Sequence, residues 1–240
     1  MDLLSGGNMG PVHRDGGDVL RPAGPWTPSV HRLLLHLRSQ GVAGVPEPRG
    51  LTDDRRERLE YFEGDVPNDP VPAWVWERRA LVSSARLLRA VHDASASADL
   101  TGPWRSPSHE PIEVVCHNDA ATYNLVFRDG LAVGLTDWDY ASPGPRLWDL
   151  AYLAYRIVPL MGADHADGFS EAERWIRCEL LRHAYGSDAS RAELVEMLVR
   201  RLRELADFSD AMSVASGNPE LAGHAVGYRR DADRLSGRIS

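Results

Sequence analysis

The sequence predicts an α+β fold, as one large domain or as two lobes, in which a small β-rich lobe would cover residues 1–65 and a larger, mostly helical lobe residues 66–240. In the first part of the chain, short apolar runs alternate with glycine-containing turns, which is typical of strands. In the second part, apolar residues recur with helical spacing. The segment at residues 63–72 is rich in proline and has the composition of a linker.

A hairpin is predicted near the start of the small lobe. Its strands cover residues 12–14 and 19–21, and a glycine-containing turn at residues 15–17 joins them. The preceding segment is also rich in glycine and includes Ser5, Gly6, Gly7 and Asn8. Glycine allows backbone amides to approach phosphate closely, so this segment is a candidate phosphate-covering loop. Alternatively, a glycine-rich chain start is simply flexible.

A helix and two more strands complete the predicted small lobe. Thr27 caps the helix, Pro28 suits its first turn, and Gly41 ends it. The apolar residues of its buried face are Val30, Leu33, Leu34 and Leu37. The strands are expected at residues 45–51 and 58–62, on either side of a polar turn.

The middle of the chain carries the strongest functional signal. Asp119 and Asn124 lie on a loop between two apolar runs, and Asp137 ends a third run. The turn at residues 128–130 joins the second and third runs as a hairpin, so Asn124 and Asp137 are expected to lie side by side. Phosphoryl transfer needs a carboxylate at the acceptor hydroxyl and oxygen ligands for magnesium, and these three residues supply them.

The pattern H-x-D-x-x-x-x-N, at His117, Asp119 and Asn124, resembles the catalytic loop of the protein-kinase-like superfamily. The resemblance is closest to the aminoglycoside phosphotransferase and choline kinase branch. Residues 137–140 (DWDY) and 148–151 (WDLA) stand in place of D-F-G and A-P-E, and no activation loop fits between them. The resemblance therefore implies a two-lobed kinase-like fold that acts on small molecules.

The resemblance also implies a role for each motif residue. Asp119 would orient and deprotonate a hydroxyl of the acceptor, and Asn124 and Asp137 would hold Mg²⁺. Asp139 would be a second acid near the metal. His117 would be an architectural residue beneath the loop rather than an acid or base.

Asp149 is expected to support the catalytic loop from below. In the resembled family, the matching aspartate accepts hydrogen bonds from the backbone of that loop, and its apolar neighbours here fit a buried position. An acid near a helix start is the alternative reading, because carboxylates are favourable at that end of any helix.

Arg21 stands where the resembled family has a lysine or arginine that contacts the nucleotide phosphates. All 27 basic residues of this chain are arginine, so no lysine is available for that role. Arginine keeps its charge and binds phosphate as a fork, so the replacement is chemically sound. The alternative is that Arg21 is a solvated strand end.

The helix of the small lobe is expected to lack the glutamate that pairs with this basic residue in the wider family. No acidic residue lies between Asp18 and Glu47, so the ion pair is predicted to be missing. His31 is the residue that could face inward instead. Either Arg21 contacts phosphate without a partner, or the small lobe does not grip a nucleotide well.

Residues 60–63, which include Tyr61 and Phe62, match the hinge that contacts the nucleobase in the resembled family. These contacts come from the backbone and leave no side-chain signature. Both ATP and GTP therefore remain open as phosphoryl donors.

The second lobe is expected to contain helices at residues 73–94, 146–158, 170–184, 189–212 and 219–235. The family builds its acceptor pocket there. Acids that could attract an amine are Asp164, Asp167, Glu171 and Glu173, and aromatic residues that could surround a quaternary ammonium group are Trp138, Tyr140, Tyr152, Tyr155 and Trp175. Aromatic residues at helical spacing are, alternatively, core residues, and acids before a helix are caps or solvated surface.

Composition fits a cytoplasmic protein. Two cysteines are too few for a disulfide framework, and the start of the chain has no secretion-signal pattern. A net charge of -8 argues against binding to nucleic acid or anionic membranes and would suit a cationic acceptor. The sequence does not indicate an oligomeric state.

The predicted function is Mg²⁺-dependent transfer of the γ-phosphate of ATP or GTP to a hydroxyl of a small molecule, either an aminoglycoside-like or a choline-like acceptor. The alternative is a degenerate kinase-like module that binds a nucleotide or a partner without catalysis, as an immunity or sequestering protein would. The predicted loss of the ion pair favours this alternative. The complete set of Asp119, Asn124 and Asp137 favours the enzyme.

Overall fold

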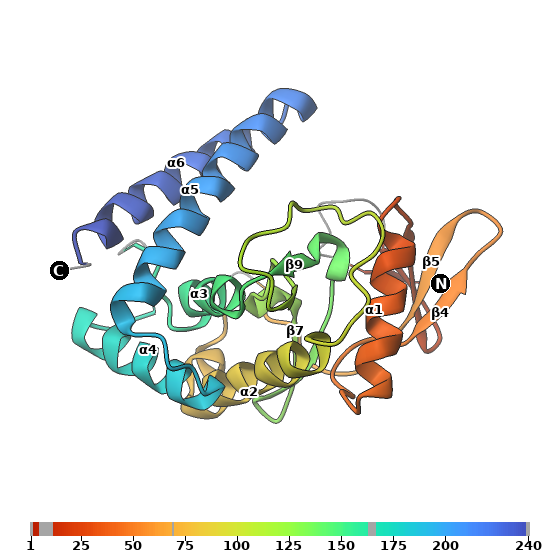
Figure 1. The fold of residues 1–240 in the computed structure, drawn as a ribbon, viewed down its shortest axis with the longest axis horizontal. Helices are drawn as coiled ribbons and strands as arrows, with labels where there is room; N and C mark the ends of the chain where they lie inside the picture. Colours follow the sequence, from red (N-terminus) through yellow and green to blue (C-terminus); the bar gives the residue numbers. More distant parts are fainter. Residues whose placement is uncertain (1, 5–11, 69, 163–166, 239–240) are drawn as a thin grey trace.

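The computed structural model describes residues 2–4, 12–68, 70–162 and 167–238. A small strand-rich region and a larger helical region lie side by side, and the helical pair α5–α6 projects from the latter (Figure 1). The predicted loop residues Ser5, Gly6, Gly7 and Asn8, and also Asp164, lie outside the described residues. No helix in the described part of the chain is both long and apolar enough to cross a bilayer.

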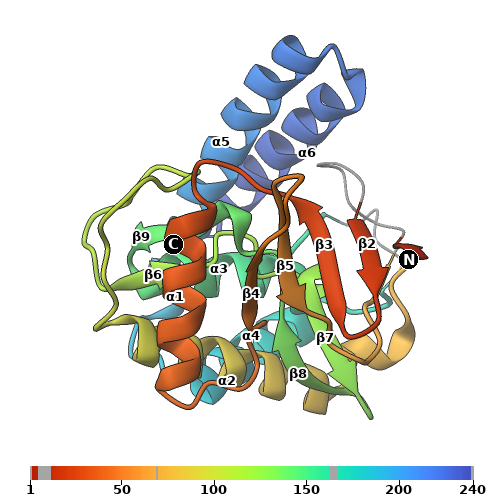
Figure 2. The ribbon, with the colours of Figure 1, turned by 90° about the vertical axis from the view of Figure 1, so that its right-hand side faces the viewer.

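The small region is a five-stranded antiparallel sheet with one helix beside it (Figure 2). In spatial order its strands are β1 (Asp2–Leu4), β2 (Val12–Asp15), β3 (Asp18–Pro22), β5 (Arg56–Glu60) and β4 (Pro48–Leu51). The helix is α1 (Thr27–Ser39), and its predicted apolar face is buried. The prediction that Thr27 caps this helix is wrong: Thr27 is the first helical residue and Trp26 is the N-cap. The Thr27 hydroxyl accepts a hydrogen bond from the amide of Gly24, which precedes the helix.

The register between β3 and β5 determines which side chains meet across the sheet. β5 starts at Arg56, two residues before the predicted strand, and Arg21 lies directly opposite Glu57. Glu57 and Leu59 are both buried, because alternate residues of a strand point to the same face. A carboxylate thus enters the interior of the small region from a strand rather than from α1.

The larger region contains five α-helices in the described part of the chain. They are α2 (Arg78–Ser95), α3 (Arg146–Ile157), α4 (Glu171–Tyr185), α5 (Arg191–Ser216) and α6 (Pro219–Ser236), and the 3-10 turn η1 (Ala73–Trp76) precedes α2. Ser170 and Ser190 form capping boxes at the starts of α4 and α5. Left-handed glycines, Gly186 and Gly217, end the same two helices. These helices match the predicted ones, although α5 continues four residues further than expected.

Two short antiparallel pairs position the loops of the site. The first pair is β7 (Leu125–Arg128) with β8 (Leu131–Leu135), and the second is β6 (Val114–Cys116) with β9 (Ser142–Gly144). Asp129 and Gly130 have φ values of 51° and 72°, so the predicted hairpin turn is confirmed. The 3-10 turns η2 (Thr122–Asn124) and η3 (Trp138–Tyr140) lie at the strand ends.

Candidate active site

The catalytic-loop segment is held from below by a buried carboxylate on α3. Asp149 accepts hydrogen bonds from the amides of His117, at 2.5 Å, and Asn118, at 2.8 Å. Its Oδ2 atom also contacts His92 Nε2 of α2 at 3.2 Å. Burial acts to raise the pKa of Asp149, but the interactions with His92 and with nearby basic groups outweigh it and lower the pKa. Asp149 therefore makes the backbone contacts that the resemblance implied.

His117 is fully buried and uses both ring nitrogens within the loop. Its Nε2 lies 2.7 Å from the carbonyl oxygen of Thr136, and its Nδ1 accepts a hydrogen bond from the amide of Asp119 at 3.2 Å. A carbonyl only accepts and an amide only donates, so these contacts require a neutral ring protonated at Nε2. Neither nitrogen is left to exchange a proton with a substrate.

Asp119 is fixed by two neighbours on the same loop. The amide group of Asn124 donates to Asp119 Oδ2 at 2.8 Å and to the Asp119 carbonyl at 2.9 Å. The hydroxyl of Tyr123 donates to Asp119 Oδ1 at 2.7 Å. Burial raises the pKa of the Asp119 carboxyl, and the two side-chain hydrogen bonds oppose only part of that effect. A carboxylate of raised basicity in fixed orientation suits a general base.

The hairpin brings Asp137 close to Asn124. Thr136 follows β8, and its amide donates to the carbonyl of Asn124 at 2.9 Å. Asp137 has a φ of 60°, in the left-handed region that a residue other than glycine seldom adopts. This conformation turns the chain sharply after β8, and the Asp137 side chain is 41% exposed. The juxtaposition expected from the sequence is therefore present.

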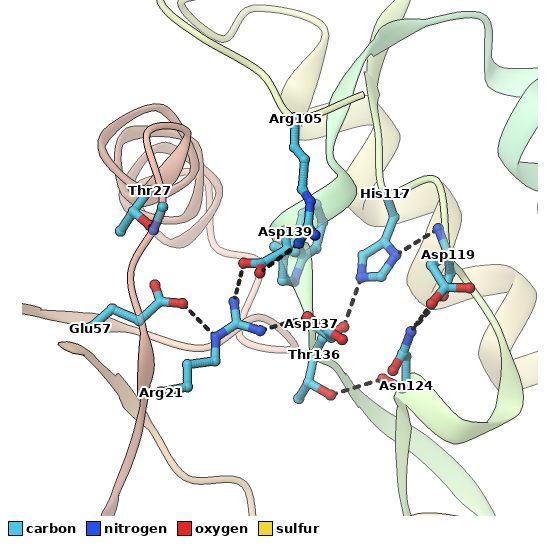
Figure 3. A network of polar contacts seen from close by, with 12 residues as sticks. Arg21, Thr27, Glu57, Arg105, His117, Asp119, Asn124, Thr136, Asp137 and Asp139 are labelled. Carbon is cyan, nitrogen blue, oxygen red and sulfur yellow. Dashed lines mark hydrogen bonds and ion pairs between the residues drawn. The ribbon is translucent and has the colours of Figure 1, made fainter. Parts of the chain in front are cut away.

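Arg21 reaches across from the sheet to both acids of the DWDY segment (Figure 3). Its Nη1 lies 2.5 Å from Asp137 Oδ1, and its Nη2 lies 2.7 Å from Asp139 Oδ1. Its Nε donates to Glu57 Oε1. Burial acts to lower the pKa of Arg21, but the three carboxylates outweigh it and raise the pKa. Arg21 is therefore not a solvated strand end.

The prediction that Arg21 lacks an acidic partner is wrong. Glu57 of β5 pairs with it across the sheet, and Glu57 is only 1% exposed. His31 of α1 does face inward, as the sequence suggested, and its Nε2 lies 3.0 Å from Glu57 Oε2. The helix thus contributes a histidine to a pair whose carboxylate comes from a strand.

Arg105 is a further member of this cluster that the sequence did not reveal. Its guanidinium lies 4.4 Å from the ring centroids of both Trp26 and Tyr140 and 3.4 Å from Asp139 Oδ2. Burial raises the pKa of Asp139, and the charge of Arg21 opposes that effect. Arg105 occurs in an irregular segment without periodicity, so no sequence signal pointed to it.

The oxygen atoms at this site are suitable ligands for a magnesium ion. Asp137 and Asp139 already share one cationic group, the Arg21 guanidinium, so their oxygens converge on a common position. Asn124 uses its amide nitrogen for Asp119, and no described residue donates a hydrogen bond to its Oδ1. Carboxylate and amide oxygens are the hard ligands that Mg²⁺ prefers.

The hinge residues lie where the sheet meets the larger region. The amide of Tyr61 donates to the carbonyl of Gly17 at 2.9 Å, and Arg14 lies 3.9 Å from the centroid of its ring. The ring of Phe62 lies against Gly134, where an added Cβ would come within 3.2 Å of it. Their proposed contact with a nucleobase stays a prediction.

The predicted acceptor groups are only partly available to a ligand. Trp138 is 1% exposed, so it is a core residue rather than part of an aromatic box. Asp167 pairs with Arg174 at 2.6 Å, and Glu173 belongs to the capping box of α4. Glu171 pairs with Arg238 at 3.0 Å. Helix capping and ion pairing thus account for the three described acids that the sequence suggested for binding an amine.

Comparisons with known proteins identify the family to which the chain is similar. A family model described as "Phosphotransferase enzyme family" matches residues 67–181. The trifolitoxin immunity protein of Rhizobium leguminosarum bv. trifolii is 34% identical over 208 residues, which cover 82% of this chain and 78% of that protein. The match extends well beyond the catalytic loop.

Solved structures share the fold at low sequence identity. A putative aminoglycoside phosphotransferase from Ralstonia eutropha superposes with a TM-score of 0.68 at 15% identity, covering 99% of this chain and 91% of that chain. A choline/ethanolamine kinase family protein from Mesorhizobium loti gives a TM-score of 0.65 at 17% identity, covering 96% and 86%. The kinase-like fold predicted from the sequence is confirmed.

Proposed function

The chain belongs to the phosphotransferase enzyme family, and on that premise we propose that it transfers the γ-phosphoryl group of ATP or GTP to a hydroxyl of a small molecule. One observation carries the proposal. Asp119, the Asn124–Asp137 pair and the Arg21 cation from the sheet converge at a single site, although they are far apart in the sequence. A scaffold that only binds a partner has no physical need for this combination.

Each of these side chains has a defined task in the proposed reaction. Asp119 Oδ1 or Oδ2 would accept the proton of the acceptor hydroxyl, because this carboxylate is buried, oriented and more basic than usual. Asn124, Asp137 and Asp139 would hold Mg²⁺, which supplies charge neutralisation at the phosphates when it is bound. Arg21 would contact the phosphates of the donor as a planar fork.

Arg21 would have to exchange partners during donor binding. In the structure its Nη1 and Nη2 atoms are both used by the acids assigned to the metal. Its Nε remains on Glu57, which would keep the stem of the side chain in place. The exchange replaces two carboxylates with phosphate oxygens and frees the carboxylates for the metal.

A second candidate is a kinase-like module that binds a nucleotide or a partner without turnover. Two observations favour it: the relative at 34% identity is named as an immunity protein, and Arg21 lies between the two proposed metal ligands. In such a module Arg21 would permanently take the place of the metal. Thermal unfolding with Mg²⁺ and a nucleotide separates the two candidates.

Thermal unfolding with Mg²⁺ and ATP or GTP tests the proposal. A nucleotide at about a hundred times its dissociation constant should add roughly 2.7 kcal/mol to the free energy of unfolding. The controls contain Mg²⁺ alone or nucleotide alone. Asp137→Asn removes a proposed metal ligand and should therefore abolish the magnesium-dependent part of the shift. The variant should still fold, because this side chain is exposed and contributes little to the core. No magnesium-dependent shift with either nucleotide would favour the non-catalytic module.

Turnover tests the assignment of the base once an acceptor is known. Asp119→Asn should lower the rate by at least about a hundredfold while the unfolding profile stays within the wild-type range. Asn has nearly the shape of Asp, so it can keep the contact with Tyr123 or with Asn124 but accepts no proton. Turnover close to the wild-type rate would exclude Asp119 as the base.

A further inference from the structure

Four tyrosines and one arginine gather beside Asp119. The tyrosine cluster consists of Tyr123 of η2, Tyr152 and Tyr155 of α3, and Tyr228 of α6. The Tyr123 and Tyr152 hydroxyls are 3.2 Å apart, and the ring centroids of Tyr155 and Tyr228 are 6.4 Å apart. Tyr123 is 37% exposed, so solvent reaches the cluster beside Asp119.

Arg156 of α3 lies at this cluster and has no anionic partner in the part of the chain that the structure describes. Its guanidinium carbon is 5.1 Å from the centroid of the Tyr123 ring, and its Nη1 lies 3.3 Å from the sulfur of Met161. Its Nε is buried and has no hydrogen-bond acceptor. No described carboxylate forms an ion pair with Arg156. A cation is rarely withdrawn from water in this way without a counter-charge.

None of the described groups around Arg156 forms an ion pair with it. Burial raises the pKa of the Tyr123, Tyr152 and Tyr155 hydroxyls, so they are neutral at physiological pH. Two carboxylates contact the cluster, and each accepts a hydrogen bond from a tyrosine hydroxyl rather than pairing with Arg156. Asp119 accepts from Tyr123, and Asp231 of α6 accepts from Tyr155 at 2.8 Å. Among the described residues, Arg156 therefore makes no direct contact with a carboxylate.

We propose that Arg156 binds an oxyanionic group of the acceptor, so that the acceptor is a hydroxyl-bearing carboxylate or phosphate rather than an amine. The inference rests on the proposed function, because Asp119 marks the position of the reacting hydroxyl. The Tyr123 side chain spans the two points: its ring faces Arg156 and its hydroxyl contacts Asp119. Tyr123 therefore contacts both the proposed anion-binding group and the proposed base.

This charge preference differs from the cationic acceptor expected from the composition. The net charge of -8 describes the whole chain, whereas a ligand responds to the groups at its own site. A quaternary ammonium at the tyrosine cluster would meet the Arg156 cation over the Tyr123 ring. An oxyanion at the same place would gain charge-assisted hydrogen bonds to the fork of the guanidinium.

The test compares aromatic probes of similar size and different charge. Dissociation constants of benzoate, phenyl phosphate, benzyl alcohol and benzylammonium are measured by ligand-observed NMR with the wild-type protein. One charge-assisted hydrogen bond should make at least one of the anions bind about tenfold tighter than benzylammonium. Benzoate and phenyl phosphate tell whether the site prefers a carboxylate or a phosphate. Tighter binding of benzylammonium, or equal binding of all four probes, would overturn the inference.

Variants assign the preference to one side chain. Arg156→Gln should remove the preference for anions, and Arg156→Lys should retain part of it because the charge remains. Arg203→Gln is the matched control, since Arg203 is also an arginine on a helix but is 59% exposed. Survival of the preference in Arg156→Gln would refute the role of Arg156. If that variant does not fold, the wild-type comparison and Arg156→Lys still decide the question.

The titrations contain no nucleotide, so they report on the acceptor side independently of the donor. A magnesium-dependent nucleotide shift together with a preference for benzylammonium would refute this inference and leave the proposed function intact. A preference for anions without any nucleotide shift would support the anion site and count against phosphoryl transfer.

Discussion

Replacing Asp149 with asparagine should destabilise the protein by roughly 3 kcal/mol. The carboxylate is fully buried and accepts from the amides of His117 and Asn118. Asparagine keeps one acceptor oxygen, so one amide retains its partner while the other meets an NH₂ group. A buried donor without an acceptor costs about 1–3 kcal/mol, and the lost charge assistance adds to this.

Urea or thermal unfolding followed by tryptophan fluorescence measures the loss. For a chain of this size, about 3 kcal/mol corresponds to a fall in Tm of roughly 6–12 °C. Asp93→Asn is the control: Asp93 pairs with Arg89 and Arg146 at the surface and is 49% exposed, so its loss should cost less than about 1 kcal/mol.

The pH dependence provides a second, independent readout. The pKa of Asp149 is lowered in the folded protein, so its stabilising contribution is complete above the pKa of an unfolded aspartate, about 3.9. That contribution is lost as the pH falls through the lower folded pKa. The difference in free energy of unfolding between wild type and Asp149→Asn should therefore become smaller in strong acid. A gap below about 1 kcal/mol at neutral pH would refute the reasoning.

Two other substitutions probe the groups around the reacting centre. Tyr123→Phe removes a hydrogen bond that lowers the pKa of Asp119, so the acidic limb of the rate–pH profile should move to higher pH; an unchanged limb would mean that Asp119 is not the base. Glu57→Gln weakens the buried pair with Arg21 and should cost about 1–3 kcal/mol in urea unfolding. Glu63→Gln, at a side chain that is 70% exposed, should be neutral by comparison, and equal losses would contradict the importance of burial.

The local parts of the site were predictable because turn chemistry and strand pairing fix them. A short turn with positive φ at Asp129 and Gly130 closes the hairpin, and an antiparallel hairpin necessarily brings Asn124 near Asp137. The same holds for the helices, whose capping serines and terminal glycines are visible in the sequence.

The partner of Arg21 was not predicted, because it depends on the register of two strands that are distant in the sequence. The predicted strand began one residue too late to include Glu57. The alternation of Glu57 with the buried Leu59 would have placed the glutamate on the inner face. Only the pairing of β3 with β5, however, identifies Arg21 as its neighbour.

The positions of Arg105 and Arg156 could not be predicted from the sequence for a different reason. Arg105 lies in an irregular segment, and Arg156 lies in the last turn of an amphipathic helix, where an arginine is ordinary. Their importance comes from what surrounds them in space, which includes rings from η2, η3 and the turn before α1. Periodicity indicates that a helical face is buried but does not indicate which charges remain unpaired there.

The contacts of Arg21 should also lower the apparent affinity of the protein for a phosphoryl donor. The same arginine joins the sheet, through Glu57, to the larger region, through Asp137 and Asp139. A donor binds only the fraction of molecules in which the latter two contacts have opened, so the measured dissociation constant is the intrinsic one divided by that fraction. A weak apparent affinity would thus measure the free energy of this internal competition as well as the quality of the nucleotide site. A larger fraction of molecules with these contacts open would strengthen binding without adding a single contact to the nucleotide.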